Sequence, residues 1–278
     1  MTVSNRTGKS KGATIEVPAT EVPVTEVRAT RDTFLGDGLT MAQPASGYRA
    51  GIDAVLLAAS VAMPAGAGFQ ILDVGAGAGT VGLCVAARLP LARVVLFERE
   101  PVLAGMAAAN IAANNFSDRA VALEGDVAIS SENLTKLGLQ QESFDWVVAN
   151  PPFHDTDNGT LAGDSLKAVS HAMPGDALEL WARFMARMAR ASGRMALIHK
   201  AEALPRILSA LEGRFGALTV LPIQPREGEP AIRVLVQGTK GSRAPMTLKP
   251  ALILHGAGQG FTPLVEAVVR QGKALPGL

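Results

Sequence analysis

The residues of this chain best suited to bind and activate a reacting group are four consecutive ones, Asn150-Pro151-Pro152-Phe153. They follow the apolar run from Phe144 to Ala149, which has the composition of a buried strand. An Asn oxygen and a carbonyl of the rigid Pro pair can together accept both hydrogens of a planar NH2 group, while an aromatic ring stacks on the ring or amide that carries it. Two acceptors pull such a delocalised amine toward tetrahedral geometry, which makes its lone pair available. The alternative is an ordinary strand-ending turn, because Asn-Pro and Pro-Pro are common turn dipeptides.

A glycine-rich loop is the second such group, with the sequence Asp73-Val74-Gly75-Ala76-Gly77-Ala78-Gly79-Thr80. Its glycines allow the backbone to turn sharply and a ligand to approach closely. Gly77, Gly79 and Gly82 also fit the G-x-G-x-x-G spacing of dinucleotide enzymes, and Glu98 fits a ribose-hydroxyl acceptor in either case. Hydride transfer does not require Asn-Pro-Pro-Phe, however, and a Walker phosphate loop is excluded because no Gly-Lys-Ser/Thr follows.

Alternating strand-like and helical patterns surround both motifs. Strands are expected at Phe69 to Val74, Ala92 to Glu98, Arg119 to Glu124, Phe144 to Ala149 and Arg194 to His199. Helices are expected at Thr80 to Leu89, Pro101 to Asn114, Glu132 to Leu139, Asp176 to Ala191 and near Leu204 to Leu211. This alternation predicts a doubly wound, mostly parallel α/β sheet that binds ligands at the carboxyl ends of its strands. Two late strands, Ala217 to Ile223 and Ala231 to Gly238, have only a loop between them and are expected to be antiparallel.

The N-terminal region differs from the rest. Residues 1–31 are rich in Thr, Ser, Glu, Val and Pro and are predicted to be a disordered, low-complexity tail. Beyond it, Phe34-Leu35 and Leu39 to Met41 flank a Gly-Asp-Gly turn and predict a short hairpin. Asp53 is expected to cap an apolar helix that runs to Met63.

Composition restricts the possible classes of protein. One Cys and four His in 278 residues exclude a disulfide framework and disfavour a structural zinc site, so an intracellular, cytoplasmic protein without a protein-bound metal is expected. Cys84 lies in an apolar helical pattern and is expected to be a buried thiol. The longest apolar run, Ala54 to Phe69, is interrupted by Pro64 and is too short for a membrane span.

These motifs together resemble a known family. Asn-Pro-Pro-Phe is similar to the (Asn/Asp/Ser)-Pro-Pro-(aromatic) signature of methyltransferases that use S-adenosylmethionine on exocyclic amino or amide nitrogens. From about Thr33 onward the chain resembles the bacterial tRNA (adenine-N6)-methyltransferases of the valine-tRNA adenine-37 type, with Gln-Pro-x-x-Gly-Tyr-Arg at residues 43–49 and Asp-Ala-Val-Leu-Leu at residues 53–57. The resemblance implies a class I, Rossmann-like methyltransferase sheet of seven strands with an antiparallel last strand. It implies a methyltransferase domain over residues 32–278, with a hairpin and lid helix at 32–66 and the core at 67–278.

The resemblance also implies roles for residues. The catalytic motif is Asn150, Pro151, Pro152 and Phe153. The residues expected to bind S-adenosylmethionine are Tyr48, Arg49, Asp53, Asp73, Gly75, Gly77, Gly79, Thr80, Glu98, Arg99, Gly125, Asp126 and Asn150. For Asp126 a helix cap is an equal alternative. Substrate contacts are expected from Phe153, His154, Lys240 and Arg243, and the long loop from His154 to Asp176 is expected to shape the acceptor pocket.

Other activities stay open at this stage. His154 completes Asn-Pro-Pro-Phe-His, which is common in guanine-N2 RNA methyltransferases. A protein-glutamine methyltransferase shares Asn-Pro-Pro, and a small-molecule O-methyltransferase shares the cofactor loop but needs a catalytic base or metal ligands. A non-enzymatic RNA-binding module would keep basic surfaces without the chemistry.

The distribution of charge favours an acidic partner, and RNA, most directly tRNA, is the one expected. Residues 181–278 hold 14 Lys/Arg against 5 Asp/Glu, whereas residues 32–180 hold 7 against 17. Four arginines recur at helical spacing after the motif, and they predict either a solvated helix face or a row of phosphate contacts: Arg183, Arg187, Arg190 and Arg194.

Overall fold

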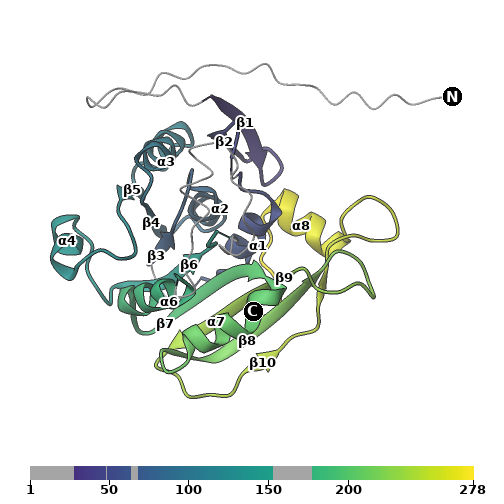
Figure 1. The fold of residues 1–278 in the computed structure, drawn as a ribbon. Coiled ribbons are helices and arrows are strands. Elements are labelled where there is room, and N and C mark those ends of the chain that lie inside the picture. The colour runs from purple at the N-terminus through teal and green to yellow at the C-terminus, as the bar shows by residue number, and fades with distance from the viewer. Residues whose placement is uncertain (1–27, 48, 64–67, 153–176) are drawn as a thin grey trace.

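A mixed sheet with helices on both faces forms the body of the molecule (Figure 1). The computed structural model describes residues 28–47, 49–63, 68–152 and 177–278. Within these residues the sheet has the order β10-β8-β9-β7-β6-β3-β4-β5, and β11 also pairs with β8. Its strands are β3 (Phe69–Val74), β4 (Ala92–Glu98), β5 (Ala120–Glu124), β6 (Phe144–Ala149), β7 (Ala189–Lys200), β8 (Phe215–Gln224), β9 (Arg233–Lys240), β10 (Thr247–Leu248) and β11 (Leu252–Ile253).

The predicted doubly wound fold is confirmed, but the sheet has nine strands in the described residues instead of the expected seven, because the short strands β10 and β11 also pair with β8. Strands β5, β4, β3, β6 and β7 are parallel, and β9 is antiparallel to both β7 and β8. The chain builds the sheet outward from β3 in both directions, first through β4 and β5 and then through β6 and β7. The order therefore reverses between β3 and β6, which is where open α/β sheets place their ligands.

Alternate side chains of the strands face two separate helical layers. One layer consists of α1 (Ile52–Ser60), α2 (Thr80–Arg88), α3 (Pro101–Ala113) and α8 (Pro263–Gln271), and the other of α4 (Ser131–Lys136), α6 (Ala177–Met188) and α7 (Leu204–Leu211), with the short 3-10 turn η1 (Ala201–Ala203) before α7. On β3, for example, Ile71 packs with the first layer and Leu72 with the second, as the two-residue period of a strand requires. In the described part of the chain, no helix is both long and apolar enough to cross a membrane.

A two-stranded hairpin of β1 (Ala29–Phe34) and β2 (Leu39–Pro44) lies outside the main sheet, beside α3 (Figure 1). The predicted hairpin is confirmed, but its first strand begins earlier than the sequence pattern suggested. Residues 29–31 pair with residues 42–44, so the boundary expected at residue 31 is wrong. A hairpin strand with one exposed face does not need an apolar run. The composition of residues 29–31, which include Arg31, therefore does not distinguish them from the tail.

Other boundaries differ for identifiable reasons. Helix α1 ends at Ser60, and its N-cap is Gly51 without a side-chain cap, so the expected cap by Asp53 and the extension to Met63 are wrong. The helix expected to reach Ala191 ends at Met188, because Ala189 pairs with Phe144 and the chain is already part of β7. Its expected start at Asp176 lies outside the described residues.

Gly82 sets the distance between α2 and the sheet. A Cβ placed there would lie 2.3 Å from Leu96 Cδ2 and 2.8 Å from Val94 Cγ1, both on β4. We therefore expect Gly82→Ala to destabilise the fold by about 1 to 3 kcal/mol through overpacking.

Gly105 in α3 is the matched control, because a Cβ there meets no atom within 4 Å. Gly105→Ala should stabilise the chain by roughly 0.5 to 1 kcal/mol, since alanine loses less backbone entropy in a helix. Chemical denaturation of both variants measures the two effects. Equal stabilities for the two variants would contradict the packing assigned to Gly82.

Candidate functional site

The glycine loop and the Asn-Pro-Pro motif leave the sheet side by side. Strands β3 and β6 are parallel neighbours, and their register pairs Val74 with Ala149. Gly75 and Asn150 are the residues that directly follow the two strands, so the glycine loop and the Asn-Pro-Pro motif begin at the same level of the carboxyl edge. Asn150 is half-buried there. The structure thus brings together the two motifs that the sequence placed 75 residues apart in the chain.

Backbone groups at the end of β4 hold the first half of the glycine loop. Gly75 and Ala76 donate their N–H groups to the carbonyl of Phe97, at 2.8 and 3.1 Å. The N–H of Gly77 donates to Oε2 of Glu98 at 2.8 Å. Each of these amides has a protein acceptor, so the loop is built to hold a ligand by shape and close approach rather than by a row of free N–H groups.

Two glycines of the loop differ in the space around their Cα atoms. Gly75, with φ +63°, has no room for a Cβ, which would lie 2.3 Å from Cη2 of Trp181 on α6. Gly77, with φ +57°, meets no atom within 4 Å at the same position. The loop therefore packs against the protein at Gly75 and faces open space at Gly77, where a ligand can approach the backbone.

Glu98 connects this loop to the helix that follows β4. Its side chain is buried, and its second oxygen, Oε1, accepts the N–H of Glu100 at 2.9 Å, directly before α3. A carboxylate oxygen has more than one acceptor site, so Glu98 can also accept hydroxyl groups of a ligand in the loop. Arg99 next to it is half-exposed and lies 3.2 Å from Glu100 and 3.7 Å from Asp126.

Asp73 lies beneath the loop instead of facing its open side. The residue is 1% exposed, and its Oδ2 accepts the N–H of Gly82 at 2.8 Å, which ties β3 to α2. Burial raises the pKa of this carboxyl to about 7, with a smaller contribution from the negative charge of Glu98, while the bond from Gly82 acts in the opposite direction. Thr80, which begins α2, is also buried. The side chain of Asp73 therefore organises the loop from inside.

Gly125 and Asp126 follow β5 at the same edge of the sheet. Gly125 donates its N–H to the carbonyl of Glu98 at 2.9 Å. The carboxylate of Asp126 accepts the N–H of Ala128 at 2.7 Å, so it caps a local turn, while α4 is capped by Ser130. The side chain is 43% exposed and its second oxygen is the one near Arg99, so the expected contact with a ligand amine stays a prediction.

The expected lid residues form ion pairs that fasten the N-terminal segment. Arg49 lies 2.6 Å from Asp32 on β1, and Asp53 lies 2.8 Å from Arg233 at the start of β9. Arg233 was not expected from the sequence, where nothing relates it to Asp53. Tyr48 lies outside the described residues, as do Phe153, His154 and the rest of the loop to residue 176.

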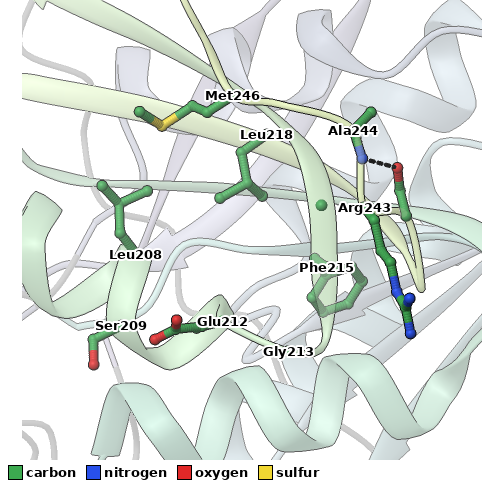
Figure 2. A pocket seen from close by; sticks show the side chains of 11 residues that line it. Leu208, Ser209, Glu212, Gly213, Phe215, Leu218, Arg243, Ala244 and Met246 are labelled. Atoms are coloured by element: carbon green, nitrogen blue, oxygen red, sulfur yellow. Dashed lines mark hydrogen bonds between the residues drawn. The ribbon is translucent and has the colours of Figure 1, made fainter.

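Lys240 and Arg243 are at the opposite edge of the sheet, so the structure does not bring them to Asn150. Strand β9 is antiparallel to β7, and its end at Lys240 therefore lies at the amino edge of the parallel strands. Lys240 pairs there with Glu142 at 2.7 Å and donates to the carbonyl of Ala189. Arg243 lines a surface pocket of about 470 Å³ together with residues of α7 and β8 such as Leu208, Phe215 and Leu218 (Figure 2).

The four arginines do not share one helix face, as both alternatives for them required. Arg183 and Arg187 are on α6, but Arg190 and Arg194 are on β7. Arg187 donates to the carbonyl of Ile129, Arg190 pairs with Asp145 at 2.7 Å, and Arg194 donates to Gln237 while it stacks over Trp146. Three of the four guanidinium groups thus hold the protein's own elements together, which contradicts the phosphate row.

Two asparagines, one in α3 and one that caps its C-terminus, were missed by the sequence reasoning. Asn110 donates to the carbonyl of Ala78 in the glycine loop at 2.9 Å, and both Asn110 and Asn114 bind the backbone of β2. Asn is unfavourable inside a helix unless its side chain has a specific partner. Two Asn four residues apart in an alanine-rich helix were the available signal.

Known proteins are similar to this chain in sequence and in fold. Residues 51–173 match the family model described as the methyltransferase small domain. A tRNA1(Val) (adenine(37)-N6)-methyltransferase of Porphyromonas gingivalis is 42% identical over 125 residues, which cover 44% of this chain and 48% of that protein. A ribosomal RNA small subunit methyltransferase C of Photorhabdus laumondii is 32% identical over 116 residues, covering 40% of this chain and 30% of that protein. The chain spans about half the length, or less, of these curated relatives.

A solved structure covers more of the chain. It is described as a predicted O-methyltransferase, protein Atu636 from Agrobacterium tumefaciens, and is 34% identical with a TM-score of 0.67. The match covers 80% of this chain and 98% of that one.

The buried carboxyl of Asp73 yields a testable pH dependence. Its pKa is raised in the folded chain, so between about pH 4 and 7 the folded state binds more protons there than the unfolded state. Stability should therefore fall as the pH rises through this window. Asp73→Asn removes the titration while keeping an oxygen that can accept from Gly82.

Thermal unfolding at pH 5 and pH 8 measures the difference. We expect the melting temperature of the wild-type chain to fall more than that of Asp73→Asn. Asp118→Asn, which changes an exposed carboxylate, is the control and should follow the wild type. Parallel pH profiles for Asp73→Asn and the wild type would show that this carboxyl does not titrate as its burial requires.

Proposed function

We propose that this chain, which matches the methyltransferase small domain over residues 51–173, is an S-adenosylmethionine-dependent methyltransferase. The proposed acceptor is an exocyclic amino nitrogen of a nucleobase, and adenine N6 in tRNA is the first candidate. The family match at residues 51–173 contains the glycine loop, Glu98 and the Asn-Pro-Pro motif. The class I, Rossmann-like fold expected from the sequence is confirmed by the strand order and by the match to the Agrobacterium structure.

One observation carries the proposal, which is the position of Asn150. It directly follows β6 and lies beside the first residue of the glycine loop on β3. An amide oxygen at this place can accept a hydrogen bond from the amino group to be methylated, next to a cofactor that occupies the loop. Of the motif's residues, Pro151 is buried and Pro152 half-buried, so the two rings fix the backbone that carries the second carbonyl.

The residues present fit S-adenosylmethionine. Gly77 faces open space, and the buried carboxylate of Glu98 borders the same loop with acceptor capacity left for ribose hydroxyls. The glycine loop, Glu98 and Asp126 would hold the cofactor. When bound, the cofactor supplies an electrophilic methyl group on a sulfonium sulfur. Because this molecule has no phosphate, a loop whose amides are already bonded suits it better than it suits a dinucleotide.

The work of Asn150 is to hold and orient the amine. Its side-chain oxygen and the Pro151 carbonyl accept the two hydrogens of an NH2 group, which favours the tetrahedral nitrogen and aims its lone pair. Positioning and preorganised acceptors lower the barrier without a strong general base, because the amine can lose its proton to water afterwards. Phe153 is the proposed stacking partner for the base.

Two independent facts support RNA as the partner. Curated relatives are named as tRNA and ribosomal RNA methyltransferases. In addition, residues 181–278 carry nine more basic than acidic residues, from 14 Lys/Arg and 5 Asp/Glu. A base in a folded RNA must leave its stack to enter a pocket at the sheet edge, as enzymes that act on base atoms generally require.

A small-molecule O-methyltransferase is the second candidate, favoured by the description of the Agrobacterium structure. A hydroxyl acceptor offers one hydrogen and generally requires a base. The two acceptors proposed here, the Asn150 side chain and the Pro151 carbonyl, match an NH2 group better than an OH group.

Nucleoside analysis distinguishes these candidates. The protein is incubated with methyl-tritiated S-adenosylmethionine and RNA from cells that lack it, and the labelled RNA is digested and analysed by mass spectrometry. We expect N6-methyladenosine in the tRNA fraction. Label in N2-methylguanosine would correct the base, and label only in small molecules or protein would contradict the RNA substrate.

Replacing Asn150 tests the catalytic role. We expect Asn150→Ala to lower kcat by about 100-fold or more, because one acceptor for the amine is lost, while the Kd for S-adenosylmethionine changes by less than about threefold. Asn150→Asp keeps an oxygen at this place and should retain more activity than the alanine variant. Turnover by Asn150→Ala at the parent rate would refute the assignment.

A further inference from the structure

The outer edge of β2 is covered by side chains of α3 and of its C-cap residue instead of by a strand. β2 pairs with β1 on one side, and on the other side Thr40 and Ala42 direct their backbone groups toward α3. Asn114 accepts the N–H of Thr40 at 3.1 Å and donates to its carbonyl at 2.8 Å. Asn110 does the same for Ala42, at 2.8 and 2.9 Å.

The spacing of the two asparagines explains why a helix can do this. Residues two apart on a strand are separated by roughly 6.6 Å, and residues four apart on a helix rise by about 6 Å. Two side-chain amides at this helical spacing therefore match two successive outward-facing peptide groups of β2. The hairpin is thus attached to α3 in one register.

Asn110 makes one contact that Asn114 does not make. Its Nδ2 has two hydrogens, and the second is donated to the carbonyl of Ala78 at 2.9 Å. The residue is 2% exposed, and these three bonds use both of its donors and its acceptor. One buried amide group therefore joins the hairpin directly to the glycine loop.

The bond to Ala78 fixes the second half of that loop. Phe97 and Glu98 hold the amides of residues 75–77, whereas Ala78 lies between the two left-handed residues Gly77 and Gly79. Ala78 is itself buried, so its carbonyl would lose a bond that water cannot easily replace. This carbonyl belongs to the peptide group between Ala78 and Gly79, so the bond holds the backbone directly after Gly77, the residue that faces open space.

We propose that Asn110 is a positioning residue that couples the N-terminal hairpin to the cofactor loop, so that cofactor binding and the ordering of β2 promote each other. The inference rests on the proposed function, because it requires S-adenosylmethionine to bind in the glycine loop. Coupling of this kind is reciprocal, so it is measurable from either side.

Asn110→Ala and Asn114→Ala form a matched pair for the test. Both variants lose two bonds to β2, but only Asn110→Ala also loses the bond to Ala78. Titration calorimetry with S-adenosylmethionine should show a Kd about tenfold higher than wild type for Asn110→Ala, as the loss of a buried hydrogen bond predicts, and within twofold for Asn114→Ala. Equal Kd values for the two variants would overturn the inference.

Hydrogen exchange of the hairpin gives a readout that a purely structural role does not move. In the wild-type chain, S-adenosylmethionine should slow exchange of the Thr40 and Ala42 amides. The slowing at Ala42, whose acceptor is Asn110, should persist in Asn114→Ala. The slowing at Thr40, whose acceptor Asn114 is retained in Asn110→Ala, should disappear in that variant. If Asn110→Ala does not fold, hydrogen exchange of the wild-type chain still tests the inference. The absence of cofactor-dependent protection at these amides in the wild-type chain would overturn the coupling.

The failure of this inference is distinguishable from failure of the proposed function. A wild-type chain that does not bind S-adenosylmethionine overturns both. A wild-type chain that binds it without protecting the hairpin overturns the coupling alone.

Discussion

The parallel register between β3 and β6 is the constraint on which the rest of the site depends. It pairs Val74 with Ala149, so the glycine loop and Asn150 begin at the same height on neighbouring strands. A shift of the register by one residue would turn every side chain of β6 to the other face and break the alternation of the two cores. The helical layers that fix the register therefore also fix the distance between the loop and the motif.

Buried polar side chains complete the loop from beneath. Asp73, Glu98 and Asn110 come from a strand end, a second strand end and a helix, and each bonds to backbone near or within residues 77–82. Such groups are costly to bury unless they are hydrogen-bonded, and here the bonds hold the loop in shape before any ligand arrives. The raised pKa of Asp73 is a consequence of this burial, and the nearby negative charge of Glu98 acts in the same direction.

Sequence patterns predicted the central elements well because burial dictates them. The bounds of β3, β4 and β6 and the neighbourhood of Asn150 and Gly75 followed from apolar runs that end in polar or glycine residues. Contacts between distant segments could not be predicted in this way. No local pattern relates Asp53 to Arg233 or Asn110 to Ala78. The arginines after the motif have helical spacing, and the sequence does not show that α6 ends and β7 begins between them. Lys240 and Arg243 were misplaced because the direction of β9 decides which edge its end reaches.

A crystal structure with S-adenosylhomocysteine and adenosine tests the central claim most directly, because it reports the position of both ligands relative to the sheet. The account predicts the cofactor product over Gly77 with its ribose hydroxyls on the Glu98 carboxylate, and the adenine amino group between Asn150 Oδ1 and the Pro151 carbonyl. A cofactor product bound away from the edge between β3 and β6, or an Asn150 amide turned away from the bound sulfur, would contradict it.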